Sequence, residues 1–177
     1  MAIAAKYDVI SVGSATEDIM IQVDSAKVVT LGDVNGSQSY LALEYGGKMH
    51  VDSILVSVGG GAVNTAISFA TMGLRAGVVS KLGRDGGGER IRQRLQEAGV
   101  STDLLVLTDQ HSTGYSTIIT TWTGERTVLV HRGASSQLTE SDLDWERLAH
   151  SQWLYVGALA GQSWRLYPVF AELARRH

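Results

Sequence analysis

Three consecutive glycines, Gly59–Gly61, stand between two patterned segments and constrain the fold more than any other feature of the sequence. Before them, residues 51–58 form a short and largely apolar run that is typical of a strand. After them, Val63, Ile67 and Ala70 recur at helical spacing. A strand that passes through a glycine turn into a helix indicates an α/β fold.

Strand-like and helix-like segments alternate through the rest of the chain. The expected core strands are residues 7–13, 76–80, 104–107 and 153–156. The expected helices follow Gly59–Gly61, span residues 89–98 and 141–149, and begin near Pro168. We expect Gly83–Gly88 to form a loop. This alternation predicts a mainly parallel sheet covered by helices.

Residues 19–58 have a different pattern, with short strands and no helical periodicity. The strand candidates are residues 19–23, 27–31, 40–45 and 51–58, and the turn signals between them are Gly32–Asp33, Asn35–Gly36 and Gly46–Gly47. Residues 113–121 and 126–132 predict a hairpin across Thr123–Glu125. We interpret residues 19–58 as a small antiparallel sheet inserted after the first strand.

The composition excludes several classes of protein. Hydrophobic residues make up 44% of the 177 residues and charged residues 19%, as in a folded globular domain. The chain contains no cysteine, which excludes a disulfide framework, a thiolate zinc site and a cysteine nucleophile. A formal charge of -3 without a basic stripe argues against a nucleic-acid partner. No apolar run reaches the roughly 18 residues that span a bilayer, and the five histidines lack metal-ligand spacing, so we expect neither a membrane partner nor a metal site.

The glycine turn could bind a dinucleotide or a polyol. The dinucleotide fingerprint is incomplete, because Asn64 replaces its third glycine and Lys81 stands where an acidic residue would contact the ribose. For a polyol, Asp18 follows the first strand and can accept hydrogen bonds from two hydroxyls. Asn64 offers a donor and an acceptor, while Gly60 and Gly61 allow the backbone to approach a ligand closely. We therefore favour a sugar-like ligand.

Two further charged residues have a structural alternative beside the functional one. Asp85 is expected to cap the helix over residues 89–98, and ligand contact is the second interpretation. Arg132, at a strand end, is solvated or contacts a substrate.

Several motifs together resemble the N-terminal signature of the PfkB (ribokinase-like) carbohydrate kinases. The strongest is Gly59–Ala66, which reads Gly-Gly-Gly-Ala-Val-Asn-Thr-Ala. The others are Gly73, Gly83–Asp85, Leu95–Val100, Thr113–Gly114, Gly124–Arg126 and Arg132–Ala134. Gly13–Asp18 is similar to the first substrate loop of that family. The resemblance covers nearly the whole chain.

The resemblance implies an α/β fold, a Rossmann-like αβα sandwich (ribokinase-like) over residues 1–177 with lid strands at about 19–58 and 113–132. It implies phosphorylation of a hydroxymethyl group on a sugar or nucleoside, with ATP and Mg2+. The lid would exclude water that would otherwise accept the phosphoryl group. The implied substrate-binding residues are Asp18, Gly60, Gly61, Asn64, Thr16 and Arg132. A cytoplasmic homodimer formed through the lid is also implied.

The family's Gly-Ala-Gly-Asp segment, which carries the catalytic base, is absent from all 177 residues. We therefore expect no catalytic residue in this chain, a base beyond His177, and no useful phosphorylation by the chain alone. The chain is expected to be the N-terminal portion of a longer protein or a naturally short relative. A non-catalytic module that binds a sugar or nucleoside is the second hypothesis. Ribose is not indicated, because Gly61 stands where ribokinase has a lysine.

Overall fold

The computed structural model describes residues 6–34 and 36–176. The chain divides into two compact units. Unit 1 contains the described residues of Met1–Glu17, Val58–Tyr115 and Val130–His177, and unit 2 contains those of Asp18–Ser57 and Ser116–Leu129.

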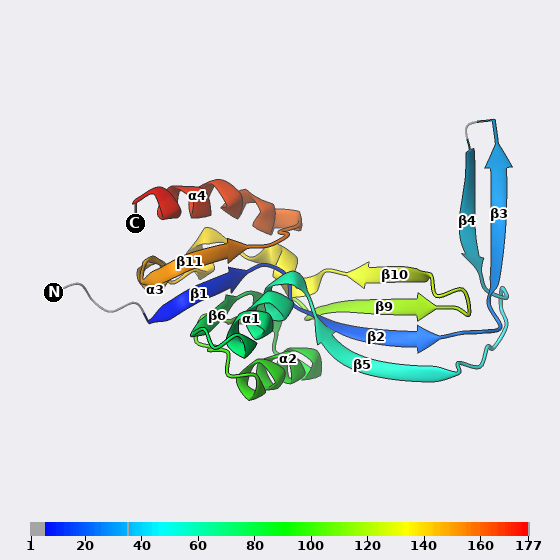
Figure 1. Ribbon diagram of the computed structural model, residues 1–177, viewed down its shortest axis with the longest axis horizontal. Coiled ribbons are helices and arrows are strands. Elements are labelled where there is room, and N and C mark those ends of the chain that lie inside the picture. Colours follow the sequence, from blue (N-terminus) through cyan, green and yellow to red (C-terminus); the bar gives the residue numbers. More distant parts are fainter. Residues whose placement is uncertain (1–5, 35, 177) are drawn as a thin grey trace. The chain divides into compact units, whose positions relative to one another are not determined.

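A three-stranded parallel sheet forms the centre of unit 1 (Figure 1). Its middle strand is β1 (Tyr7–Val12), which pairs with β6 (Ala76–Val79) on one side and β11 (Ser151–Val156) on the other. β1 and β6 are almost completely buried, which explains why both are largely apolar and show no strict alternation.

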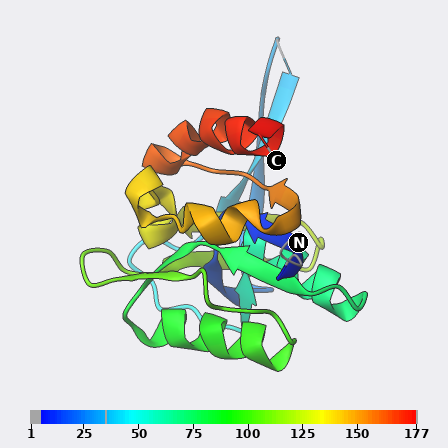
Figure 2. The ribbon, with the colours of Figure 1, turned by 90° about the vertical axis from the view of Figure 1, so that its left-hand side faces the viewer.

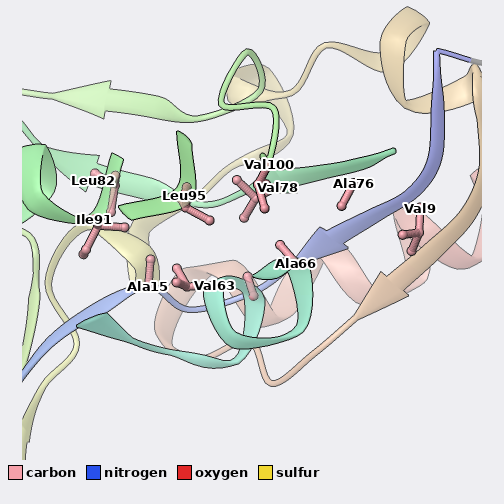
Figure 3. Packing of buried hydrophobic residues seen from close by; sticks show 11 residues of the cluster. Val9, Ala15, Val63, Ala66, Ala76, Val78, Leu82, Ile91, Leu95 and Val100 are labelled. Atoms are coloured by element: carbon pink, nitrogen blue, oxygen red, sulfur yellow. The ribbon is translucent and has the colours of Figure 1, made fainter. Parts of the chain in front are cut away.

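Helices α1 (Gly61–Thr71) and α2 (Gly86–Glu97) pack against one face of this sheet. Figure 3 shows the cluster they form, in which α1 supplies Val63 and Ala66 and α2 supplies Ile91 and Leu95. All four side chains are fully buried. Of the three residues that set the helical spacing after the glycines, Val63 is fully buried, and Ile67 and Ala70 are partly buried against the same cluster.

Helix α4 (Tyr167–Arg176) and several short helices cover the opposite face. The short helices are η1 (Gly133–Gln137), η2 (Glu140–Asp142), α3 (Trp145–Ala149) and η3 (Gly161–Leu166). Figure 2 shows α4, in red, and α2, in green, on opposite sides of the strands of unit 1. Because successive side chains of a strand alternate in direction, Val9 packs in the cluster of α1 while Ile10 packs in the cluster of Phe170. This layering confirms the predicted αβα sandwich.

Two further short strands, β7 (Lys81–Gly83) and β8 (Val106–Thr108), pair in parallel within unit 1. Among the described residues, no helix is both long and apolar enough to cross a membrane.

Unit 2 contains an antiparallel hairpin and a four-stranded sheet of mixed strand direction (Figure 1). The hairpin of β3 (Lys27–Asp33) and β4 (Gly36–Ala42) pairs Val29 with Tyr40. A four-stranded sheet has the order β10-β9-β2-β5. Its strands are β2 (Thr16–Gln22), β5 (Ser53–Gly59), β9 (Gly114–Thr120) and β10 (Arg126–His131). Two residues at one end of each strand are assigned to unit 1. A small core of Val23, Ala26 and Ile119 lies within unit 2. These strands overlap the ranges predicted for the lid, and their action as a lid stays a prediction.

Three local expectations were wrong. The segment predicted as a loop at Gly83–Gly88 contains the first turn of α2, because Asp85 caps the helix three residues earlier than the periodicity indicated. Gly32–Asp33 continues β3 and does not form a turn. The other turn signal, Asn35–Gly36, is only partly testable, because Asn35 lies outside the described residues. The helix expected over residues 141–149 is divided into η2 and α3, because Asp144 begins a new helix by accepting from the Arg147 N–H.

Candidate functional site

The loop before β2 packs against the N-terminus of α1, where the glycine turn lies. The Ser14 carbonyl accepts from the Ala62 N–H at 3.0 Å, and the Ser14 hydroxyl accepts from the Gly61 N–H at 3.1 Å. Gly60 has a φ of 94°, and a Cβ at this position would lie 2.7 Å from the Ala15 Cα. Only glycine fits here without strain.

These contacts bear on which ligand the turn could hold. Two amide donors at the start of α1 already have a partner in Ser14, so they are not free to bind a phosphate as in a dinucleotide site. Asn64, one turn into the helix, has an exposed side chain. Its backbone N–H donates to the Gly60 carbonyl at 3.0 Å. The arrangement favours contact with a neutral polar ligand through Asn64.

Thr16 and Asp18 occupy the beginning of β2. Thr16 is buried in unit 1, and Asp18 is half-buried in unit 2. As residues two apart on one strand, they face the same side of the sheet. The convergence of Asp18 with Asn64 on one ligand stays a prediction, because the two residues belong to different units.

A close approach of three backbone segments surrounds Gly114, the first residue of β9. A Cβ at Gly114 would lie 2.8 Å from the Ala15 carbonyl oxygen, 2.9 Å from that of Arg132 and 3.1 Å from a methyl group of Thr16. The structure therefore brings the backbone of Arg132 beside Thr16. The Arg132 side chain is exposed, and its carbonyl accepts from the Ser135 hydroxyl.

Asp85 is a structural residue, as its first interpretation predicted. Its carboxylate accepts from the Gly88 N–H at 2.8 Å, from the Thr113 N–H at 2.8 Å and from the Thr113 hydroxyl at 2.7 Å. Burial favours a higher pKa, but the hydrogen bonds from Thr113 and Gly88 outweigh it and hold the pKa of the Asp85 carboxyl below its usual value. Both oxygens are engaged, so the helix cap also fixes the start of β9.

Two ion pairs were not predicted from the sequence. The buried Glu17 carboxylate pairs with both Nε and NH2 of Arg90. Lys81, considered above only for its place in a dinucleotide fingerprint, donates to the Asp142 carboxylate at 2.9 Å. Glu17 lies in the segment Gly13–Asp18, directly before an expected strand, and a charged side chain that becomes buried there needs a partner. The sequence does not indicate which residue that partner is.

A pocket of about 370 Å³ opens beside Glu17, and its lining includes Asp85, Thr113, Tyr115 and His131. Two of the polar lining residues, Glu17 and Thr113, are buried. Its lining does not include Gly60, Gly61 or Asn64, so it is separate from the glycine turn.

The described residues contain no group of three or more His, Asp or Glu side chains that could hold a metal ion. The Mg2+ that the resemblance implies therefore does not fit a site formed by the side chains of residues 6–34 and 36–176.

Comparison with known proteins identifies relatives over most of the chain. Residues 25–174 match the pfkB family carbohydrate kinases. The chain is 31% identical to the ribokinase of Staphylococcus aureus (strain COL) over 121 residues, which cover 66% of this chain and 40% of that protein. It is 33% identical to a fructokinase of Salmonella typhimurium over 109 residues, which cover 60% of this chain and 35% of that protein.

The fold has solved counterparts as well. Arabidopsis thaliana ribokinase, determined in complex with ribose and ATP, superimposes with a TM-score of 0.67 at 20% identity. The superposition covers 85% of this chain and 45% of that one. The chain thus spans less than half the length of the curated relatives it matches.

Proposed function

The chain belongs to the pfkB family of carbohydrate kinases, and from this premise we propose that it is the substrate-binding part of a sugar or nucleoside kinase. The intact protein transfers a phosphoryl group from ATP to a hydroxymethyl group of its substrate. The observation that carries the proposal is the glycine turn itself. Ser14 occupies the amide donors at the start of α1, and the Asn64 side chain remains exposed beside them.

In this proposal, Asp18 and Asn64 bind hydroxyl groups of the substrate. Gly60 and Gly61 let the backbone approach it, while Thr16 and Arg132 border the same site. A carboxylate and an amide suit this task, because the carboxylate accepts hydrogen bonds from hydroxyls and the amide can both accept and donate.

The catalytic base, the nucleotide site and the Mg2+ ligands are supplied by residues outside this chain. This part of the proposal is supported by the relatives, of which the chain spans 40% and 35%, and by the lack of a metal-binding group among residues 6–34 and 36–176. A cytoplasmic location belongs to the same proposal. If the present chain acts without those residues, it is a module that binds a sugar or nucleoside and does not phosphorylate it.

We also propose that unit 2 pairs with a second copy. The hairpin of β3 and β4 exposes Val29, Leu31 and Tyr40, with 41%, 61% and 46% of their surface accessible. A two-stranded hairpin is marginally stable in water by itself, and exposed apolar side chains favour association.

Replacing Asp18 by alanine in the intact protein tests the substrate site. We expect the sugar KM to rise about 10- to 100-fold, because a hydrogen bond to a charged group contributes about 1.5–3 kcal/mol. The ATP KM should stay within about twofold, since a lost sugar contact leaves nucleotide binding unchanged. Steady-state kinetics with varied sugar and varied ATP measures both.

The matched control is Asp24→Ala, which removes another carboxylate of unit 2. Asp24 accepts hydrogen bonds from Gln22 on the protein surface, and no role in the site is proposed for it. An unchanged sugar KM in Asp18→Ala would remove Asp18 from the site.

A further inference from the structure

Glu17 is the buried charge that the proposed substrate site does not use. Only 7% of the residue is accessible, although it lies in a strand between the proposed substrate residues Thr16 and Asp18. Both of its carboxylate oxygens engage Arg90 of α2, and the contact between Oε2 and NH2 measures 2.9 Å. The pair joins residues that are 73 positions apart.

Stability alone gives a weak reason for such a pair. Burying the Glu17 carboxylate costs desolvation, and the Arg90 side chain is 56% exposed, so water screens the attraction between them and limits its contribution to stability. A two-point pair of a carboxylate with a guanidinium does something that apolar packing does not, because it fixes direction as well as distance.

The direction matters because of where Glu17 lies on β2. Side chains alternate along a strand, so Glu17 faces one side while Thr16 and Asp18 face the other. Holding Glu17 against α2 therefore sets the rotation of the strand at the two residues that flank it.

The helix that holds Glu17 is itself anchored. Asp85 caps α2 and binds both the N–H and the hydroxyl of Thr113, directly before β9. Arg90 thus extends from a helix turn whose position relative to the start of β9 is already fixed.

We propose that Glu17 and Arg90 are positioning residues that orient the start of β2, so that Thr16 and Asp18 are presented correctly to the sugar or nucleoside. This inference rests on the proposed function. Neither residue is assigned contact with the substrate, and both act through the strand between them and the ligand.

Kinetics of Glu17→Gln in the intact protein is the first test. The variant keeps the size of the side chain and removes its charge. We expect the sugar KM to rise about tenfold or more, because small misplacements of binding groups are costly, while the ATP KM stays within about twofold. A second variant, Glu17→Leu with Arg90→Met, replaces the pair by apolar packing and keeps the experiment informative if one single variant folds poorly. A restored sugar KM in this double variant would overturn the proposal, because a structural role alone would then suffice.

Arg92→Met is the matched control. Arg92 lies on the same helix and pairs with Glu89 at 2.7 Å, but on the exposed surface. It should leave both KM values unchanged. A folded Glu17→Gln protein whose sugar KM also stays within about twofold of the wild type would contradict the inference.

Hydrogen exchange separates this inference from the proposed function. In Glu17→Gln, the amides of residues 16–20 should exchange about tenfold faster than in Arg92→Met, because the strand has lost its anchor. If the wild type neither binds nor phosphorylates any sugar or nucleoside, the proposed function fails, and the exchange rates still report on the strand. Equal exchange in the two variants overturns the positioning role whatever the kinetics show.

Discussion

At the scale of single residues, Gly60 and Gly61 have different reasons to be glycine. Gly60 has a positive φ of 94° and lies against the backbone of Ser14 and Ala15. Gly61 begins α1, and a Cβ there would meet its nearest neighbour, the Ser14 hydroxyl, at 3.9 Å. The sequence alone does not distinguish these two glycines, and the structure does.

Gly60→Ala should therefore lower the free energy of unfolding by at least about 2 kcal/mol, through backbone strain and overpacking. Gly61→Ala is the control and should change stability by less than about 1 kcal/mol, because its space is open and its conformation is helical. Urea unfolding of both variants measures the difference. Equal stability of the two variants would contradict this prediction, because it would show that the glycine turn accommodates a Cβ at position 60 without strain.

Asp85 supplies a prediction for the pH dependence of stability. Burial acts to raise its pKa in the folded state, but the hydrogen bonds from Thr113 and Gly88 lower it, so its contribution to stability is present above the unfolded value of 3.8. The contribution is lost as the pH falls through the lower pKa of the folded state. Asp85→Asn keeps one acceptor but directs an NH2 group at the Thr113 N–H.

We expect Asp85→Asn to be less stable than the wild type by about 1–2 kcal/mol at pH 7, and the difference to shrink below about pH 4. Thermal unfolding across pH 3–7 follows it. The control is Asp109→Asn, which changes an exposed carboxylate that pairs with Arg84 at 3.4 Å. A deficit of Asp85→Asn that stays constant with pH would contradict the assigned role of the charge.

At the scale of elements, the hairpin of β3 and β4 provides the test of self-association. Val29 and Leu31 lie two apart on β3 and share one exposed face. Val29→Lys with Leu31→Lys places two like charges on that face, which opposes docking of a second copy. The molecular mass should fall from dimer to monomer in analytical ultracentrifugation.

Gln93→Lys with Gln96→Lys adds the same charge to the exposed surface of α2 and should leave the mass unchanged. A wild type that is monomeric at all concentrations would refute the proposed pairing.

The helices show which element boundaries can be anticipated. The inward face of α2 follows from Ile91 and Leu95, four residues apart, which the sequence displays directly. Its start at Gly86 does not follow from periodicity, because it depends on Asp85 reaching the Gly88 N–H. An aspartate such as Asp85 is a typical N-cap, but the three glycines after it have a low helix propensity. The sequence therefore predicted a loop at these glycines and a later start for the helix.

At the scale of the whole molecule, the chain matches less than half the length of its curated relatives. We expect purified residues 1–177 to release no ADP from ATP in the presence of sugars or nucleosides, because the sequence lacks the Gly-Ala-Gly-Asp segment. Calorimetry on the same sample reports whether a ligand still binds.

A coupled assay for ADP with the intact protein as the positive control checks this expectation. Turnover by residues 1–177 at the rate of the intact protein would place the base among the residues described here. Ligand binding without turnover in the intact protein as well would favour the non-catalytic module.

The alternation of apolar runs and glycine turns was sufficient to predict a mainly parallel sheet covered by helices, because strand and helix periodicity are properties of residues two to four positions apart; the αβα layering itself came from the family resemblance. The cap at Asp85 is also local, since its acceptor and the Gly88 N–H are three positions apart, but it rests on the residue type and not on periodicity. The partners of Glu17, Ser14 and Asp85 were settled only by the tertiary structure, since Arg90, Gly61 and Thr113 lie 73, 47 and 28 positions away. Such pairs leave no periodic trace in the sequence, because the path of the folded chain, and not local spacing, brings their side chains into contact.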